Sequence, residues 1–378
     1  MATKPAQSIT KHFAAISDPR TGNAKQHVLL DIIVIAICAA VCGADTWVEV
    51  EVWGKANHPW LRTFLDLPNG IPSHDTFRRV FILLDARQFR RCFLHWIRAV
   101  RKLTQGQIVA IDGKKLRRSH DRACGKHALT MVSAWATANR VVLGQLRVNA
   151  KSNEMKVIPE LLKLLDLTGC IVTLDALNCQ TQIAQQIRAQ KANYVLAVKD
   201  NQGHLYEDLK DLFAECLLEN FHQVPHDYHR TVNKGHGRIE IRECWTLSDS
   251  EFLDYLHQRQ QWSGLQTVAL VRAERRQNAK RSVALRYYIS SLANDARRIL
   301  KSVRQHWGIE NRLHWVLDIA FREDESRMRR GNSPENFAVV RHIAHALLKQ
   351  ERSEKIGTKA KRLKAACDRD YLIKVLSI

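Results

Sequence analysis

The chain has 378 residues, of which 45% are hydrophobic and 26% are charged, a balance that excludes a wholly disordered or fibrous protein and predicts two or three domains. Lysine and arginine total 59 against 38 aspartate and glutamate residues, so the formal net charge is +21. This excess favours an extended polyanion as partner, because each phosphate that a cation neutralises releases condensed counterions. A basic protein that binds no polyanion remains the alternative.

The chain shows no sign of a membrane segment or of secretion. Its most apolar stretch, Ile32–Val41, is far shorter than the roughly 20 residues that span a bilayer. No charged-then-apolar signal segment opens the sequence. The nine cysteines include no Cys-x-x-Cys pair, which favours free thiols in a reducing compartment over a zinc site. We therefore expect a cytoplasmic protein with no membrane partner.

The pattern of residues 1–105 predicts helices. Apolar residues recur at helical spacing from Leu29 to Ala40, and two further helices are expected at 73–84, with Ser73 as N-cap, and at 87–103. Arginines lie along these two helices. A cationic helical module of this kind predicts a DNA-binding domain over residues 1–105, although a solvated basic face would have the same composition.

The composition changes at Gln107, where short runs rich in β-branched residues begin. Strands are expected at 108–112, 128–137, 140–148, 170–175 and 194–198, and helices at 155–166 and 179–190. This order of elements is that of a ribonuclease H-like core. The expected fold is therefore an α/β protein with a ribonuclease H-like mixed sheet, preceded by the helical N-terminal domain.

Two aspartates end strands of this core. Asp112 follows Ile-Val-Ala-Ile, and Asp175 follows Cys-Ile-Val-Thr-Leu. A right-handed helical crossover places the first and fourth strands side by side and parallel, with the sheet order reversing between them. Ligand sites form at such a switch point, beyond the carboxyl ends of the strands, and neighbouring strands lie about 4.8 Å apart. The two carboxylates are therefore expected close enough to share cations.

A third acid comes from a long helical pattern over residues 296–321. A helix that follows the last strand and a β-rich insertion, expected at about 200–292, would pack across the switch point and bring Glu310 to the two aspartates. Glu310 belongs to a ridge of polar residues on this helix at four-residue spacing, which consists of His306, Glu310, His314 and Asp318. Such a ridge is more often a solvated face than a functional site.

Three carboxylates without a thiolate cluster suit hard divalent cations. We expect two ions of Mg²⁺ or Mn²⁺, held by Asp112, Asp175 and Glu310. Such a pair activates an attacking oxygen and stabilises the leaving oxygen in phosphoryl transfer. A zinc site built from His306, Glu310 and His314 is the alternative that the residues leave open.

Five motifs occur in order along nearly the whole chain. They are VAIDGKKLRRS around Asp112, VTLDALNCQ around Asp175, NYVLAVKDNQ at 193–202, GHGRIEIRE at 235–243 and HWGIENRLHWVLDIAFREDESRMRRGN at 306–332. With them the chain resembles the DDE transposases of bacterial insertion sequences, and most closely the H-repeat-associated proteins linked to Rhs elements. The resemblance implies a β-rich insertion between the second and third acids, and Asp112, Asp175 and Glu310 as catalytic metal ligands.

One departure from the broader family concerns phosphate binding. That family often carries Tyr, Arg, Glu and Lys at fixed spacing around the last acid, whereas Val303, His306 and Leu317 stand here at the positions of the tyrosine, arginine and lysine. The corresponding phosphate clamp is therefore absent or rebuilt. The candidates for rebuilding it are Lys301, Arg304 and Arg312.

Basic side chains follow the first acid and surround the last one. At the mouth of the expected site they would contact phosphates without reading sequence. A tight turn at Asp112 and Gly113 followed by a solvated basic loop is the alternative for the first cluster. The candidates for DNA binding are Lys114, Lys115, Arg117, Arg118, Arg304, Arg312, Arg327, Arg329 and Arg330.

The catalytic domain is expected to span residues 106–350. Ser333 and Pro334 predict the N-cap and first turn of its last helix, which runs to about Lys349. The remaining residues, 351–378, are rich in lysine and arginine. They are expected to form a basic tail that acts as a mobile arm or a weak dimer contact.

The expected function is that of a DDE transposase. Such an enzyme binds the ends of its element, hydrolyses a phosphodiester to expose a 3′ hydroxyl and joins that hydroxyl to target DNA. The expected partner is double-stranded DNA, as element ends and as target, bound by a homodimer at the nucleoid. The alternatives are a structure-selective nuclease or Holliday-junction resolvase, which stops at hydrolysis, and a domesticated DNA-binding protein that does not use the acids.

Overall fold

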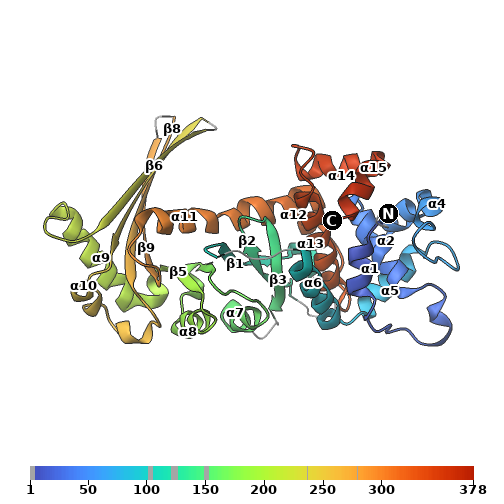
Figure 1. Cartoon of the computed structure of the whole chain (residues 1–378), viewed down its shortest axis with the longest axis horizontal. Coiled ribbons are helices and arrows are strands. Elements are labelled where there is room, and N and C mark those ends of the chain that lie inside the picture. The colour runs from blue at the N-terminus through green and yellow to red at the C-terminus, as the bar shows by residue number, and fades with distance from the viewer. Residues whose placement is uncertain (1–4, 101–104, 121–126, 149–152, 236, 279) are drawn as a thin grey trace.

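The computed structural model describes residues 5–100, 105–120, 127–148, 153–235, 237–278 and 280–378. One mixed sheet of nine strands runs from the middle of the molecule to one end, and a body of helices fills the other end (Figure 1). The strands are β1 (Ile108–Lys115), β2 (Thr130–Ala136), β3 (Val141–Val148), β4 (Ile171–Leu174), β5 (Asn193–Val198), β6 (Asp227–Gly235), β7 (Arg238–Leu247), β8 (Thr267–Gln277) and β9 (Lys280–Ser290). The helices are α1 (Gln7–Phe13), α2 (Leu29–Val41), α3 (Trp47–Ala56), α4 (His58–Leu61), α5 (His74–Leu83), α6 (Ala86–Val100), α7 (Glu154–Lys163), α8 (Thr181–Ala189), α9 (Gly203–Leu218), α10 (Ser250–Asp254), α11 (Ala296–His306), α12 (Trp315–Phe321), α13 (Ser333–Gln350), α14 (Thr358–Cys367) and α15 (Arg369–Leu376).

Five strands form the centre of the sheet in the order β3-β2-β1-β4-β5. β1 is parallel to β4, with Ile108 opposite Ile171, and antiparallel to β2. The sheet order therefore reverses between β1 and β4, and this part of the prediction is confirmed. The first four residues of β1 are fully buried, because helices cover both faces of the sheet, and this burial explains the unbroken apolar run.

β1 does not end at Asp112, which corrects the expectation. Its ladder with β2 continues through Asp112 as far as Lys115, and this pairing also rules out a tight turn at Asp112. The parallel ladder with β4 ends earlier, at Ala110 and Thr173. Beyond that point one side of β1 is paired and the other is not, which leaves a notch at the end of the sheet beside Asp112.

The segment between β5 and α11 contains more than strands. It begins with α9, whose buried residues, among them Leu205, Leu209 and Leu212, follow a helical spacing. Four antiparallel strands follow, and β9 pairs with β5, so the insertion extends the main sheet. Within the insertion the sequence predicts strands at 239–247, 266–274 and 282–291, which correspond to β7, β8 and β9. It does not predict β6, which lies at the edge of the sheet and is mostly exposed.

The helical pattern over residues 296–321 is interrupted where the third acid lies. α11 ends at His306, a π-helical turn covers Glu310–His314, and α12 begins at Trp315. A π-turn holds more residues than an α-helical turn and therefore rotates the side chains that follow it around the axis. The expectation of one regular helix is wrong at this point.

The helical body takes its elements from both ends of the chain. α2 is buried almost throughout and packs against α13, and α14 also contacts it. The backbone N–H of Ala6 donates to the carbonyl oxygen of Leu376 over 3.2 Å. No helix of the described residues is long and apolar enough to cross a membrane, and the eight described cysteines are all unpaired.

Three predicted helix ends can be compared with the structure. Ser73 caps α5 as predicted and accepts a hydrogen bond from the Thr76 backbone. α13 has Asn332 as its N-cap, one residue before the predicted Ser333, with Pro334 in its first turn. α6 is described to Val100, and the predicted end at 103 lies outside the described residues.

The basic tail is folded, so the expectation of a mobile arm is wrong. α14 and α15 pack against α13, and the side chains of Ala365, Leu372 and Val375 are buried. Even Lys361 is buried and forms an ion pair with Glu351 at 3.2 Å. The reason is that apolar residues recur every three or four positions among the charged ones, which is the pattern of amphipathic helices.

Candidate active site

Three acids that are far apart in the sequence line one pocket. The pocket has a volume of about 260 Å³ and is lined by residues of β1, β4, β5, β9 and α11 and by the π-turn. Asp112 enters it from β1, Asp175 from the residue directly after β4, and Glu310 from the first position of the π-turn. The fold thus brings together the acids that the sequence singles out.

Asp112 lies at the notch with its side chain only 20% exposed. Its Oδ1 accepts a hydrogen bond of 2.8 Å from the backbone N–H of Gly113. Burial raises the pKa of Asp112 to about 7; the Gly113 hydrogen bond opposes this, and the negative charges of Asp175, Glu154 and Glu310 add to it. A cation bound nearby would lower this pKa and keep the carboxylate ionised.

Asp112→Asn is expected to stabilise the cation-free protein at pH 8. The pKa of Asp112 is higher in the folded state than its ordinary value of 3.8, so the folded state holds the proton more tightly. Stability is therefore lost as the pH rises from about 4 towards 7. Asparagine avoids this loss, and we expect a gain on the order of 4 kcal/mol at pH 8, because each pKa unit corresponds to about 1.4 kcal/mol.

Urea unfolding of both proteins at pH 5 and pH 8 measures this effect. The difference between the variant and the wild type should grow with pH, because the wild type alone ionises a buried group over this range. If the difference in unfolding free energy between the variant and the wild type is the same at pH 5 and pH 8, the proposed burial of charge at Asp112 is contradicted.

Asp175 is oriented by the short 3₁₀ turn η4 (Ala176–Asn178) that follows β4. It is the N-cap of this turn, and its Oδ1 accepts hydrogen bonds from the Asn178 backbone N–H at 3.3 Å and from the Asn178 side-chain amide at 2.7 Å. One carboxylate oxygen is thus fixed by the protein. The side chain enters the pocket in a defined orientation.

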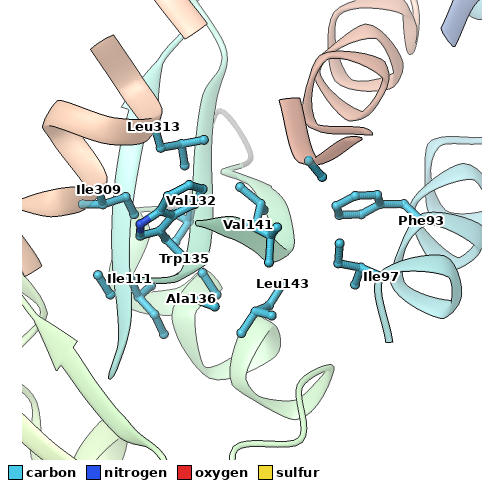
Figure 2. Close-up of a cluster of buried hydrophobic side chains, with 14 of the residues drawn as sticks. Phe93, Ile97, Ile111, Val132, Trp135, Ala136, Val141, Leu143, Ile309 and Leu313 are labelled. Carbon is cyan, nitrogen blue, oxygen red and sulfur yellow. The ribbon is translucent and has the colours of Figure 1, made fainter. Parts of the chain in front are cut away.

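The Glu310 side chain is exposed, but the helix turn to which it belongs is packed against the sheet. Ile309 and Leu313 flank it in the sequence and are fully buried. Figure 2 shows both side chains directed at Val132 and Trp135 of β2. These contacts fix the rotation of the helix around its axis, so that Glu310 is held at the pocket. π-turns within helices occur frequently at functional sites.

The other members of the polar ridge all have partners, so the ridge is not a solvated face. His306 Nδ1 lies 3.0 Å from Thr173 Oγ1, and His314 Nδ1 lies 3.7 Å from Asp112 Oδ2. Burial lowers the pKa of His306, and it lowers that of His314 to about 3. Both imidazoles are therefore neutral at pH 7 and add no positive charge to the pocket.

The donor chemistry of the pocket fits divalent cations that prefer oxygen. Among the described residues, no three His, Cys, Asp or Glu side chains already form a complete metal-binding group. Mg²⁺ and Mn²⁺ commonly take only some ligands from the protein and the rest from water or a phosphate. Asp112, Asp175 and Glu310 share one pocket, so incoming water or phosphate could complete their coordination of a cation. The zinc set of His306, Glu310 and His314 does not share it, because His314 is not part of the lining.

Lys114 forms ion pairs with acidic side chains of the protein itself. Its ammonium group lies 2.6 Å from Asp318, 3.1 Å from Asp324 and 3.3 Å from Glu323, and its side chain is only 10% exposed. Burial opposes the charge of Lys114, but these carboxylates outweigh it and raise its pKa. We therefore exclude Lys114 from the proposed DNA contacts. Arg117 pairs with Asp324 at 3.1 Å and remains largely exposed.

A second, larger cavity of about 830 Å³ lies where α5, the start of α3 and residues 322–333 meet. β1 leads towards it from Asp112 through the exposed Lys115. Among the described residues, no ion pair involves Arg118, Arg327 or Arg330. Arg78 and Arg322 are paired with acids, and Arg329 donates to the carbonyl oxygen of Arg118 at 3.0 Å. We call it the arginine cavity, and the arginines that line it are Arg78, Arg118, Arg322, Arg327, Arg329 and Arg330.

Two cations of the pocket are absent from the prediction. Lys199 follows β5 and Arg286 belongs to β9, and both line the pocket with the acids. Only the pairing of β5 with β9 brings them together. Lys199 belongs to the motif at 193–202, but nothing in the sequence around Arg286 links it to the acids. None of the residues predicted to rebuild the phosphate clamp lines the pocket; they are Lys301, Arg304 and Arg312. Arg304 instead donates to Asn233 Oδ1 at 2.7 Å.

Two family models match the chain. One, described as DDE_Tnp_1-associated, covers residues 10–97, and the other, described as Transposase DDE domain, covers residues 78–347. The chain belongs to the DDE transposase family. The resemblance carried by the five sequence motifs is thereby confirmed.

Individual members of this family match nearly the full length of the chain. It is 40% identical over 375 residues to "Putative transposase YncI" of Escherichia coli O157:H7, a match that covers 98% of this chain and 95% of that protein. It is 37% identical over 377 residues to "H repeat-associated putative transposase YhhI" of Escherichia coli strain K12, which covers 98% of both chains. Among solved structures, a piggyBac transposase synaptic complex with hairpin DNA matches at a TM-score of 0.44 and 12% identity, covering 98% of this chain and 78% of that one.

Proposed function

We propose that this family member is an active DNA transposase with a ribonuclease H-like core formed by β1–β5. The observation that carries the proposal is the convergence of Asp112, Asp175 and Glu310 in one pocket at the point where the sheet order reverses. The protein would bind element ends, hydrolyse a phosphodiester and join the resulting 3′ hydroxyl to target DNA. Membership of the DDE transposase family supports this reaction.

The residues of the pocket divide into two groups by charge. Two divalent cations held by Asp112, Asp175 and Glu310 would supply an activated attacking oxygen and stabilise the leaving oxygen. Lys199 and Arg286 would bind the phosphates beside the scissile bond, which places the reacting group and offsets its charge. Such positioning is most of what phosphoryl transfer needs from a protein.

DNA would leave the pocket along the basic surface that leads to the arginine cavity. β1 connects the two places, since Asp112 and the exposed Lys115 lie on one strand and Arg118 follows shortly after it. Arginine is suited to phosphate because its planar guanidinium donates two parallel hydrogen bonds. The basic helices over residues 1–105 would contribute further contacts, and a homodimer would hold the two ends of an element together.

A strand-transfer assay tests the proposal. The protein is incubated with Mg²⁺, a linear DNA that carries the inverted ends flanking its own gene, and a supercoiled target plasmid. Joined products are expected, because the same pocket serves hydrolysis and transfer. Cleavage without joining would instead identify a structure-selective nuclease, and binding without either reaction would identify a domesticated DNA-binding protein.

Replacing Arg118, Arg327 and Arg330 together with alanine should weaken DNA binding and flatten its dependence on salt. Each lost phosphate contact reduces the slope of log K against log salt by about 0.9, so three contacts correspond to a change of about 2 to 3. Fluorescence anisotropy at several KCl concentrations measures the slope. Lys163→Ala, an exposed cation on α7, is the control, and an unchanged slope in the triple variant would refute binding at the arginine cavity.

A further inference from the structure

A fourth acid lies beside the three that line the pocket. Glu154, the first residue of α7, is half-buried, and its carboxylate rests on Gly113. A β-carbon at position 113 would overlap both carboxylate oxygens of Glu154. Gly113 is not among the residues with positive φ, so its backbone conformation does not require glycine. The space that Glu154 occupies does require it.

Asn178 connects this acid to the site. Its side chain is hydrogen-bonded to Glu154 and also donates to Asp175 Oδ1 at 2.7 Å. Asn178 is fully buried, and its Oδ1 has no hydrogen-bond partner among the described residues. A buried oxygen of this kind normally has a water or an ion beside it. The unpartnered oxygen therefore marks a position beside Asn178, the residue that links Asp175 and Glu154, where a water or an ion is expected.

Glu154 approaches Asp112 from the side of the sheet opposite to Glu310. α7 packs against β2 and β3 on one face, whereas α11 packs against β1 and β4 on the other (Figure 1). The two faces meet at the notch, because the ladder between β1 and β4 ends at Ala110. Asp112 thus has one acid on each side of the sheet and Asp175 at the neighbouring strand end.

We propose that Glu154 is a fourth carboxylate ligand of the divalent cations in this site, bound directly or through a coordinated water, and that Gly113 provides the space for it. The inference rests on the proposed function, since it requires the pocket to bind cations. An acid in the first turn of a helix also stabilises that helix through the helix dipole. That role needs neither the contact with Gly113 nor the hydrogen bond to Asn178.

Manganese binding by the full-length protein tests the inference without any need for catalysis. Free Mn²⁺ is followed by electron paramagnetic resonance during titration at pH 8 in the absence of DNA. Glu154→Gln should weaken binding by about 10–100-fold, the range found when groups that support a metal site are removed. Glu160→Gln, a change of an exposed acid on the same helix, should leave the affinity within twofold of the wild type.

A second pair of variants separates coordination from folding. Gly113→Ala should weaken Mn²⁺ binding by a similar factor, because the new methyl group displaces the Glu154 carboxylate. In a Glu154→Ala background the same methyl group meets no carboxylate, so Gly113→Ala should then have no further effect. If the two changes weaken binding independently, Gly113 acts on the site in some other way and the inference is wrong.

The outcomes also distinguish this inference from the proposed function. If the wild type binds no Mn²⁺, or Asp112→Asn binds it equally well, the proposed metal-dependent function fails. If the wild type binds, Asp112→Asn does not, and Glu154→Gln binds as the wild type does, only the role of Glu154 is refuted. Circular dichroism melts of every variant establish that the comparison is made between folded proteins.

Discussion

Asp112→Asn and Asp175→Asn should each reduce DNA cleavage by at least about 10³-fold while leaving DNA affinity within about twofold of the wild type. Both carboxylates line the pocket, and amides are poor ligands for Mg²⁺, so the reacting oxygens would lose a stabilisation of several kcal/mol. DNA affinity depends instead on cations that neither substitution touches.

Radiolabelled DNA with element ends, incubated with Mg²⁺, gives the cleavage rate, and filter binding in Ca²⁺ gives the affinity. Asp166→Asn changes an exposed acid after α7 and serves as the control. If Asp112→Asn or Asp175→Asn cleaves at the wild-type rate, the pocket is not the catalytic site. If both variants also lose DNA affinity, the acids act in binding, and the mechanism has to be revised.

Arg362→Ala should destabilise the protein by about 3–5 kcal/mol, the usual effect of leaving a buried charge without its partner. Arg362 is buried, pairs with Asp45 at 2.8 Å and donates to the carbonyl oxygens of Ala40 and Ala320. Burial raises the pKa of Asp45, and Arg362 opposes that rise. Without the arginine, the Asp45 carboxylate would lose its ion pair and the Ala320 carbonyl oxygen would lose a hydrogen-bond donor.

Thermal and urea unfolding measure the loss of stability. Lys359→Ala, an exposed cation of the same helix, should change the free energy of unfolding by less than about 0.5 kcal/mol. If Arg362→Ala is no less stable than Lys359→Ala, the contacts of Arg362 between the tail and the helical body contribute little to the free energy of unfolding.

The central strands and the positions of Asp112 and Asp175 are predictable because their signals are local, whereas the expectation for Glu310 depends on the resemblance to the family. Apolar runs such as Ile108–Ile111 identify buried strands, and the order of elements then fixes which strands are neighbours. The positions of Asp112 and Asp175 follow from that order without any knowledge of side chains. The apolar spacing of α9 is also a local signal, so this helix is predictable from the sequence as well, and the expectation of a purely β-rich insertion is wrong to leave it out.

Other features depend on tertiary contacts and leave no local signal. From the sequence alone, Lys114 is expected to be an exposed member of a basic cluster. Only the fold brings Asp318, Glu323 and Asp324 around it. Arg286 enters the pocket because β9 pairs with β5. The π-turn at Glu310 lies where the helix packs against β2, and its residues include no glycine or proline that would signal it.

The contact between Ala6 and Leu376 joins segments that are far apart in the sequence. During synthesis α2 emerges long before α13 and α14, which cover part of its surface. Until then that apolar surface is exposed, although α1 and α3 already pack against other sides of α2. A nonsense mutation between Glu310 and α13 is therefore expected to produce insoluble, rapidly degraded protein even though Asp112, Asp175 and Glu310 are all present.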